Sequence, residues 1–430
     1  MRKISIIAAV TAVLLPLTGC ADLGAGADDE ALEIWIRKPP GSEAAATGQR
    51  LVDAFTEKTG IPVRLTPIQE DFETKLQQRT IQKALPDIII NDTAQLGAMN
   101  SQGILREITK DAIEGSEHVP ERAWDGATGT DGGIYGVPHT AHAFGLYVRG
   151  DRLKEAGLDE PETMSEFADV VAALGENGAD AAPFAVPGST KRGYLSWNFA
   201  SFLWSSGGDY LTETDDGQWV SAIGGDESTA AVQWLQDLSC EGGIQPGAPS
   251  MDTTATEELF ESGGADMFLS LPHKLSGFAE GVGTENLDVV APPAGAAGRT
   301  VLAEGNNTYL MQGSDHPDEQ IAFAEFSITQ EAQVLAMDGD RGGNIVRIPV
   351  NDQVVMSDVR DDPRWDTFQT IYDEYGRYVP RVPSWTPFLQ MSADAFNGLI
   401  ADCDADVGAT LDTLDDRFTE ELAEQEVLGS

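Results

Sequence analysis

Cysteine and positively charged residues are both scarce in this sequence of 430 residues. It contains three cysteines, Cys20, Cys240 and Cys403, and none lies in a Cys-x-x-Cys or Cys/His spacing, so a zinc site has no support. Lysine and arginine number 27 against 71 aspartates and glutamates, which gives a formal charge of −44 at pH 7. Because such a field repels phosphate backbones, we expect no nucleic-acid partner.

Long apolar runs are also missing, and the one at the start of the chain is short. Residues 4–17 form a largely apolar segment of 14 residues behind Arg2 and Lys3. A helix needs about 20 apolar residues to cross a bilayer, so a permanent transmembrane anchor is disfavoured. The layout is typical of a secretory signal.

A cysteine directly follows this run, in the stretch LTGC. The stretch resembles the lipobox of bacterial lipoproteins, in which the cysteine becomes the lipidated first residue. We therefore expect a lipoprotein signal peptide over residues 1–19, a diacylglyceryl group on Cys20 and a flexible tether over residues 20–31. The protein would then lie on the extracytoplasmic face of the bacterial cell membrane, attached only through its lipid. The alternative is ordinary cleavage that leaves a free thiol.

The two remaining cysteines, Cys240 and Cys403, lie in the part of the chain that we expect to be folded. An exported protein meets oxidising conditions, which allow disulfides to form and persist. The sequence leaves two alternatives open, a disulfide between them or two separate buried thiols.

Strand and helix patterns alternate from residue 32 onwards. Residues 32–37 alternate as a strand does, residues 49–60 have helical spacing, and residues 86–92 form a continuous apolar run of the kind buried in a parallel sheet. This order predicts a doubly wound α/β lobe, whose ligands gather at the carboxyl ends of the strands. About 400 residues suffice for two such lobes.

Several stretches occur in a characteristic order over most of the chain. They are IWIRKPPG, LVDAFTEKTGIPVRL, LPDIIIND, DGGIYGVP, LWSSGGDYL, LFESGGADMFLSLP and FAEFSITQEAQ. Together they resemble the extracellular solute-binding lipoproteins of ABC importers, of the maltose and multiple-sugar type. The resemblance extends from residue 32 to about residue 422.

The resemblance implies a two-lobed periplasmic-binding-protein-like α/β fold of type II, with mixed sheets flanked by helices and joined by hinge crossovers. Lobe 1 would comprise residues 32–140 and 299–345, and lobe 2 residues 141–298 and 346–430. It also implies a monomer that captures a sugar in the cleft between the lobes. The lobes would close on this sugar and deliver it to the transmembrane subunits of a permease.

A sugar ring calls for an aromatic platform and for polar side chains that bind its hydroxyls. The resemblance places Trp197 and Trp385 near the cleft, with core packing and loop packing as their respective alternatives. Asn91 and Asp92 follow the buried strand, where the alternative is capping of the next helix.

Seven further residues are expected at the site. Lys38 and Glu43 follow the first strand, although a long cation there is often solvated and an acidic residue at a helix start has its own electrostatic role. The others lie at or near the expected crossings between the lobes, or on the second lobe; they are His139, His142, His273, Asn306 and Arg341.

His273 is a departure from the resemblance, because many relatives have a sugar-stacking tryptophan at this place. Together with Lys38 and Arg341, it leaves an acidic sugar as an alternative to a neutral mono- or oligosaccharide. A third alternative is a solute that is not a sugar, such as a peptide, a polyamine or a metal chelate.

Catalytic motifs are missing as well. The sequence has no Gly-x-Ser-x-Gly, His-Glu-x-x-His or phosphate-loop pattern. A tethered glycoside hydrolase needs two carboxylates at a defined spacing across the glycosidic bond. With 71 acidic residues, the sequence does not indicate which two would form this pair. We therefore expect no enzyme, no cofactor and no bound metal, and keep the hydrolase as a remote alternative.

Overall fold

A computed structural model describes residues 31–176, 181–339 and 341–429. The predicted signal peptide, the predicted lipidation of Cys20 and nearly all of the predicted tether lie outside these residues. Within the described ranges, no helix is both long and apolar enough to cross a membrane.

The first lobe is built on a six-stranded sheet within the described part of the chain, in the order β12-β11-β3-β1-β2, with β4 paired to β11. The three N-terminal strands are parallel, whereas β11 runs antiparallel to β3 and β4. The strands are β1 (Leu32–Ile36), β2 (Val63–Pro67), β3 (Ile88–Asp92), β4 (Val137–Ala143), β11 (Val301–Leu310) and β12 (Gly376–Arg377).

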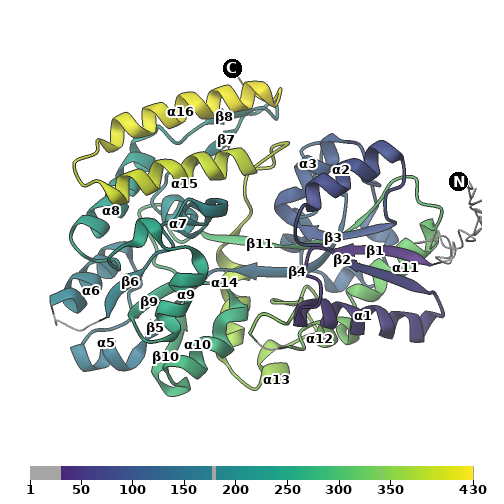
Figure 1. Ribbon diagram of the computed structural model, residues 1–430, viewed down its shortest axis with the longest axis horizontal. Coiled ribbons are helices and arrows are strands. Elements are labelled where there is room, and N and C mark those ends of the chain that lie inside the picture. The colour runs from purple at the N-terminus through teal and green to yellow at the C-terminus, as the bar shows by residue number, and fades with distance from the viewer. Residues whose placement is uncertain (1–30, 177–180, 340, 430) are drawn as a thin grey trace, which may run out of the picture.

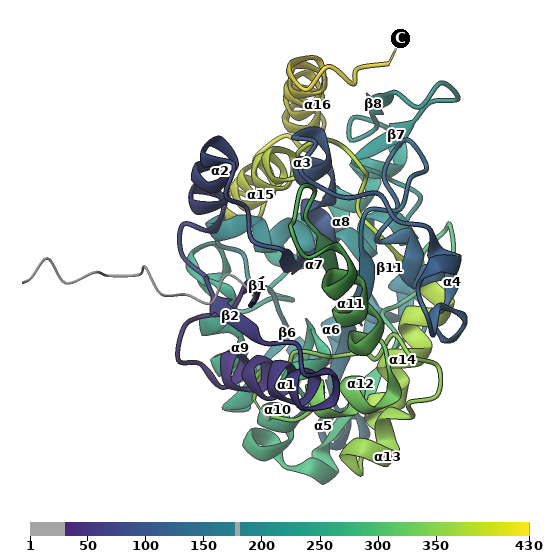
Figure 2. The ribbon, with the colours of Figure 1, turned by 90° about the vertical axis from the view of Figure 1, so that its right-hand side faces the viewer.

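Helices cover both faces of this sheet (Figures 1 and 2). Successive side chains of a strand point to opposite faces, so Ile88 and Ile90 join the main core while Ile89 packs with Trp35 and Phe72 on the other side. The helices are α1 (Glu43–Thr59), α2 (Phe72–Gln82), α3 (Leu96–Ser101), α4 (Glu121–Asp125), α11 (Pro317–Ser327) and α12 (Gln330–Ala336).

Helix α1 shows how local sequence sets an element. The Ala45 amide donates to Ser42 Oγ over 3.1 Å at its start, and Gly60 ends it in a left-handed conformation with φ 78°. Its buried face includes Leu51 and Phe55, as the helical spacing predicts. The structure thereby seats α1 against the sheet and beside α12 (Figure 2).

The second lobe holds a four-stranded mixed sheet in the order β10-β5-β9-β6, together with a β7-β8 hairpin, among the described residues. Its strands are β5 (Gly145–Arg149), β6 (Ala182–Ala185), β7 (Leu211–Glu213), β8 (Trp219–Ser221), β9 (Ala265–Ser270) and β10 (Leu287–Val290). Its helices are α5 (Gly150–Ala156), α6 (Met164–Glu176), α7 (Tyr194–Ser205), α8 (Asp226–Cys240), α9 (Thr253–Glu261), α10 (Leu275–Val282), α15 (Thr386–Ala401) and α16 (Val407–Glu424).

A disulfide joins Cys240 to Cys403. It links the end of α8 to the loop between α15 and α16. Of the two alternatives that the sequence left open, the structure therefore shows the disulfide.

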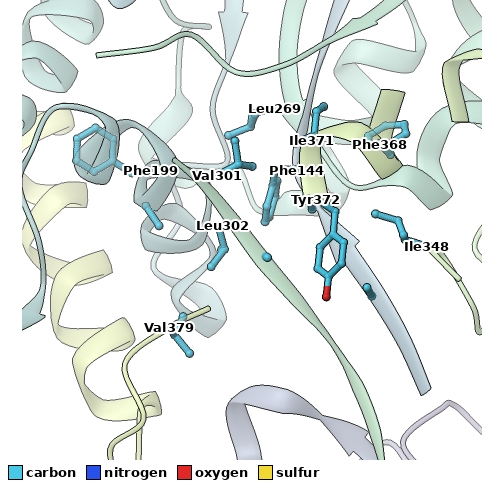
Figure 3. Close-up of a cluster of buried hydrophobic side chains, with 14 of the residues drawn as sticks. Phe144, Phe199, Leu269, Val301, Leu302, Ile348, Phe368, Ile371, Tyr372 and Val379 are labelled. Atoms are coloured by element: carbon cyan, nitrogen blue, oxygen red, sulfur yellow. The ribbon is translucent and has the colours of Figure 1, made fainter. Parts of the chain in front are cut away.

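Strands β4 and β11 run side by side between the two lobes (Figure 1). Helix α14 (Arg364–Tyr375) packs against both strands, and α13 (Met356–Arg360) packs against α14. Figure 3 shows Phe368 and Tyr372 of α14 in the same buried cluster as Phe144 and Val301 at the ends of the crossing strands. The contact between the lobes at the crossing strands is thus apolar.

The expected two-lobed α/β architecture with mixed sheets is confirmed, whereas the exact lobe boundaries stay a prediction. Ile348 still pairs with Ala141, and Asn351 Nδ2 donates to the carbonyl of Ile328 over 2.8 Å. Because these contacts belong to the first lobe, we propose that the third crossing lies after residue 354 rather than at residue 346.

Candidate functional site

Charged and polar side chains from both lobes converge beside the crossing strands. Lys38 follows β1, Asp92 ends β3, Tyr194 begins α7, and His273 and Lys274 follow β9. Each of these groups is close enough to others of the set for their charges to influence one another. The interlobe cluster consists of Lys38, Asp92, His139, His142, Tyr194, Glu257, His273, Lys274, Glu304, Asn306 and Arg347.

His142 and Glu304 face one another across the β4–β11 pair, with 3.8 Å between Nε2 and Oε2. Burial lowers the pKa of His142 well below its usual range and raises the pKa of Glu304 well above its own. Desolvation disfavours the charged form of each group, so burial favours the neutral form of both. A neutral imidazole and a carboxylic acid each have one hydrogen-bond donor and one acceptor to offer.

Several polar atoms of this cluster are buried without a protein partner among the described residues. They are His142 Nδ1, Glu304 Oε1, His139 Nε2 and His273 Nδ1. Leaving a buried polar group unbonded costs about 1–3 kcal/mol. Their convergence from both lobes suits a solute that presents several hydroxyl groups.

The two nearest cations are Lys38 and Arg347. Burial lowers the pKa of Lys38 to about 8, the Arg347 charge lowers it further, and Asp92 opposes the shift. The backbone amide of Arg347 donates to Thr140 Oγ1 over 2.9 Å, which holds this segment against β4. Burial also lowers the pKa of Arg347.

The carboxylates of the cluster already have partners. Asn306 Nδ2 donates to Asp92 Oδ1 over 2.7 Å, and Lys274 Nζ lies 2.6 Å from Glu257 Oε2. Asp92 and Asn306 are opposed in the β3–β11 register, which brings their side chains together.

Aromatic surface comes from the first turn of α7. Tyr194 and Trp197 are three residues apart and therefore lie on one face of the helix. Tyr194 is 36% exposed, whereas Trp197 is half-buried against the core. Arg347 and Asp92 both influence the pKa of Tyr194, which burial raises, so its phenol belongs to the cluster.

Most of the predicted site residues come together here, but four lie elsewhere. Asn91 points to the opposite sheet face and lines a cavity with residues of α2 and α3. Trp385 is 3% exposed and packs between Tyr210 and Phe388. The alternation of side chains along a strand and the apolar surface of the second lobe explain these two corrections.

The other two corrections concern charged residues at the edge of the cluster. Arg341 is exposed and forms ion pairs with Glu261, at 3.4 Å, and with Glu280. Glu43 begins α1, and its carboxyl group lies directly against Gly343. Glu43 therefore contacts the 341–347 segment, and Arg341 pairs with α9 and α10 at the edge of the cluster.

Sequence reasoning missed Tyr194, Glu257, Lys274, Glu304 and Arg347. Two of these left a signal in the sequence, because Tyr194 precedes Trp197 by one helical turn and Arg347 lies in the same RGGNIVR stretch as Arg341. Glu304 is identified only by its strand register, and Glu257 and Lys274 only by the packing of α9.

Two cavities border the crossing. The smaller, of about 220 Å³, is lined by Lys38, His139 and Asn306, with Arg37 and three isoleucines, and so belongs to the cluster. The larger, of about 960 Å³, lies between α3 and residues 378–383. We place the functional site at the cluster because the buried unbonded polar atoms lie there.

The sequence profile of the bacterial extracellular solute-binding proteins matches residues 39–334. A putative binding protein of Brucella abortus is 22% identical over 276 residues, which is 63% of each chain. A putative ABC transporter periplasmic-binding protein of Escherichia coli, YcjN, is 24% identical over 259 residues, or 58% of this chain and 57% of that one. The chain thus spans about 60% of the length of these curated relatives.

Solved structures of similar fold include the sugar-binding protein MalE of Xanthomonas citri, with a TM-score of 0.79, 19% identity and coverage of 92% and 98% of the two chains. The GacH receptor of Streptomyces glaucescens, solved with acarbose, has a TM-score of 0.76, 19% identity and the same coverage. UgpB of Mycobacterium tuberculosis, in complex with glycerophosphocholine, has a TM-score of 0.75 at 16% identity, covering 94% and 100%. At these identities the likeness establishes the fold.

Proposed function

Because the chain belongs to the bacterial extracellular solute-binding proteins, we propose that it captures a mono- or oligosaccharide between its lobes and delivers it to the permease of an ABC importer. It acts by binding and not by catalysis, as a monomer held to the extracytoplasmic face of the membrane by a lipid on Cys20. The ligand site is the interlobe cluster defined above.

The observation that carries this proposal is the set of buried, unbonded polar atoms from both lobes and the crossing strands. A sugar hydroxyl both donates and accepts, so it can satisfy a neutral imidazole or a carboxyl group such as that of Glu304. The exposed part of Tyr194, next to Trp197, offers an aromatic surface for the apolar face of a sugar ring.

Ligand capture would couple to closure of the lobes. Arg192 of the second lobe lies 3.9 Å from Glu70 of the first, and both side chains are largely exposed. Such a pair contributes at most about 1 kcal/mol, so it does not hold the lobes together by itself. A solute that contacts both lobes favours the closed arrangement by its differential affinity for that state.

A thermal-shift screen across mono-, di- and oligosaccharides tests the proposal, because a ligand that binds only the native state raises the melting temperature. Tyr194→Ala should abolish most of the shift. Tyr375→Ala is the matched control, since that tyrosine packs on Arg299 at 5.0 Å, outside the cluster. A response to peptides or polyamines with none to any saccharide would reject the sugar assignment.

A further inference from the structure

We propose that the sugar carries an oxyanion, a carboxylate or a phosphate, and that Arg347 and Lys38 bind this group. The inference rests on the proposed function and names the chemical class of the solute. It depends on which charged groups of the interlobe cluster already have partners and which do not.

Arg347 lies at the centre of the cluster. The charges of Asp92, Tyr194, Glu304 and Glu257 all act on its guanidinium group, so residues of both lobes and of β11 surround it. Its backbone is fixed, because its amide donates to Thr140 Oγ1 and the next residue, Ile348, pairs with Ala141. The side chain therefore projects from a segment that is fixed against β4.

Neither cation has an ionic partner within the described residues. The guanidinium group of Arg347 and Nζ of Lys38 form no hydrogen bond there and no ion pair within 4.0 Å. Other partly buried arginines of this chain do pair with carboxylates: Arg149 with Asp151 at 2.7 Å and Arg364 with Asp362 at 2.6 Å.

The neighbouring acids do not supply the missing charge. Asp92 accepts from Asn306, Glu257 pairs with Lys274, and Glu304 lies 3.8 Å from His142 in a buried position that favours its neutral form. The histidines are neutral near pH 7, because burial lowers their pKa values. Within the described residues, Lys274 is thus paired with a carboxylate, whereas Lys38 and Arg347 have no carboxylate within 4.0 Å.

An oxyanion on the solute supplies the counter-charge. A guanidinium group binds a carboxylate or phosphate through two parallel hydrogen bonds, and a lysine ammonium adds a point charge. The formal charge of −44 does not forbid this, since charges farther away than about 8 Å are largely screened at physiological salt. The remaining hydroxyls of the sugar would bind the unbonded histidine and glutamate atoms.

Isothermal titration with matched pairs of sugars tests the proposal. The affinity for glucose is compared with that for glucuronate and that for glucose 6-phosphate, and disaccharides are compared with and without a uronate. These pairs separate the contribution of the oxyanion from that of the sugar ring, and they distinguish a carboxylate from a phosphate. We expect the anionic member of at least one pair to bind at least tenfold more tightly. Equal or tighter binding of every neutral member would overturn the oxyanion while leaving the sugar receptor intact. Binding of no saccharide at all would overturn both.

Variants locate the binding groups. Arg347→Met and Lys38→Met should each remove most of the preference for the anionic sugar, and Arg347→Lys should retain part of it. Arg417→Met, an exposed arginine on α16, is the control with the same change of charge. Circular dichroism and the melting temperature of each variant show whether it folds. A folded Arg347→Met protein that keeps the full preference would remove this residue from the site.

Discussion

Buried titratable residues between the lobes carry charges that differ from those they have in water. Burial raises the pKa of Glu304 and lowers that of His142, because desolvation penalises the charged form of each. Lys38 keeps its charge at this pH, since burial lowers its pKa only to about 8. Lys38 therefore changes charge close to physiological pH.

The charge of Lys38 predicts a pH dependence of ligand binding. A lysine with a pKa of about 8 is protonated below pH 8 and neutral above it. Affinity for an anionic sugar should thus fall by up to about tenfold between pH 7 and pH 9. The facing histidines and Tyr194 titrate outside this window, because burial lowers the pKa of the former and raises that of the latter.

Titration calorimetry at pH 7, 8 and 9 measures this dependence. In Lys38→Met the affinity should be nearly constant across the range, and in Lys154→Met, an exposed lysine on α5, the fall should persist. A wild-type affinity that does not change with pH would show that Lys38 does not contact the oxyanion.

The positions at which α1 and α7 begin determine which of their side chains lie near the site. Helix α1 starts where the Ala45 amide donates to Ser42 Oγ, and its first turn lies against the 341–347 segment through Glu43 and Gly343. Helix α7 begins at Tyr194, so that its first turn presents the aromatic surface. The positions of these starts therefore decide which side chains reach the cluster.

Removing the α1 cap should destabilise the protein. Ser42→Ala deletes the acceptor for the Ala45 amide and should lower the free energy of unfolding by about 1 kcal/mol. Ser42→Asp keeps an acceptor and should retain most of the stability. Urea unfolding of the three proteins measures the difference, and equal midpoints would show that the cap contributes nothing.

The disulfide joins elements that are far apart in the sequence. Cys240 and Cys403 are separated by 163 residues, and the chain-entropy model gives about 5 kcal/mol for a loop of that length. The double variant Cys240→Ser/Cys403→Ser should accordingly lose up to this amount of stability. Thermal unfolding with and without reductant is the measurement: reductant should lower the melting temperature of the wild type and leave that of the variant unchanged.

At the scale of the whole molecule, the two lobes are joined by β4, β11 and the segment that leads to α14. Their contact surface contains the apolar cluster of Phe144, Val301 and Phe368 (Figure 3). Because the side chains of this surface are close-packed, they favour a few distinct arrangements of the two lobes over intermediate ones. The polar cluster beside it is where a solute would bias that choice.

Attachment to the membrane is a prediction about the whole chain. The mature protein, recovered from membranes, should lack residues 1–19 and carry a diacylglyceryl group on Cys20, which intact-mass spectrometry detects. Cys20→Ala should release the protein into the soluble fraction. Equal amounts of wild type and variant on the membrane would contradict the lipid anchor.

The sequence by itself determined the α/β class, the order of strands and helices in the first lobe, and the family. These follow from local periodicity and from motifs that are contiguous in the chain, such as LPDIIIND and DGGIYGVP. It also nominated Asp92, because residues at the carboxyl ends of parallel strands meet at one edge of a sheet, and the resemblance nominated Lys38 and the histidines of the crossing.

Only the tertiary structure decided which arginine and which carboxyl group lie in the interlobe cluster. Arg341 and Arg347 are six residues apart in one stretch, yet one is held outward by Glu261 while the other is fixed by Thr140 beside β4. Glu304 is one of 71 acidic residues and is singled out by its register opposite His142. Burial and long-range pairing depend on contacts between distant segments, which local sequence patterns do not encode.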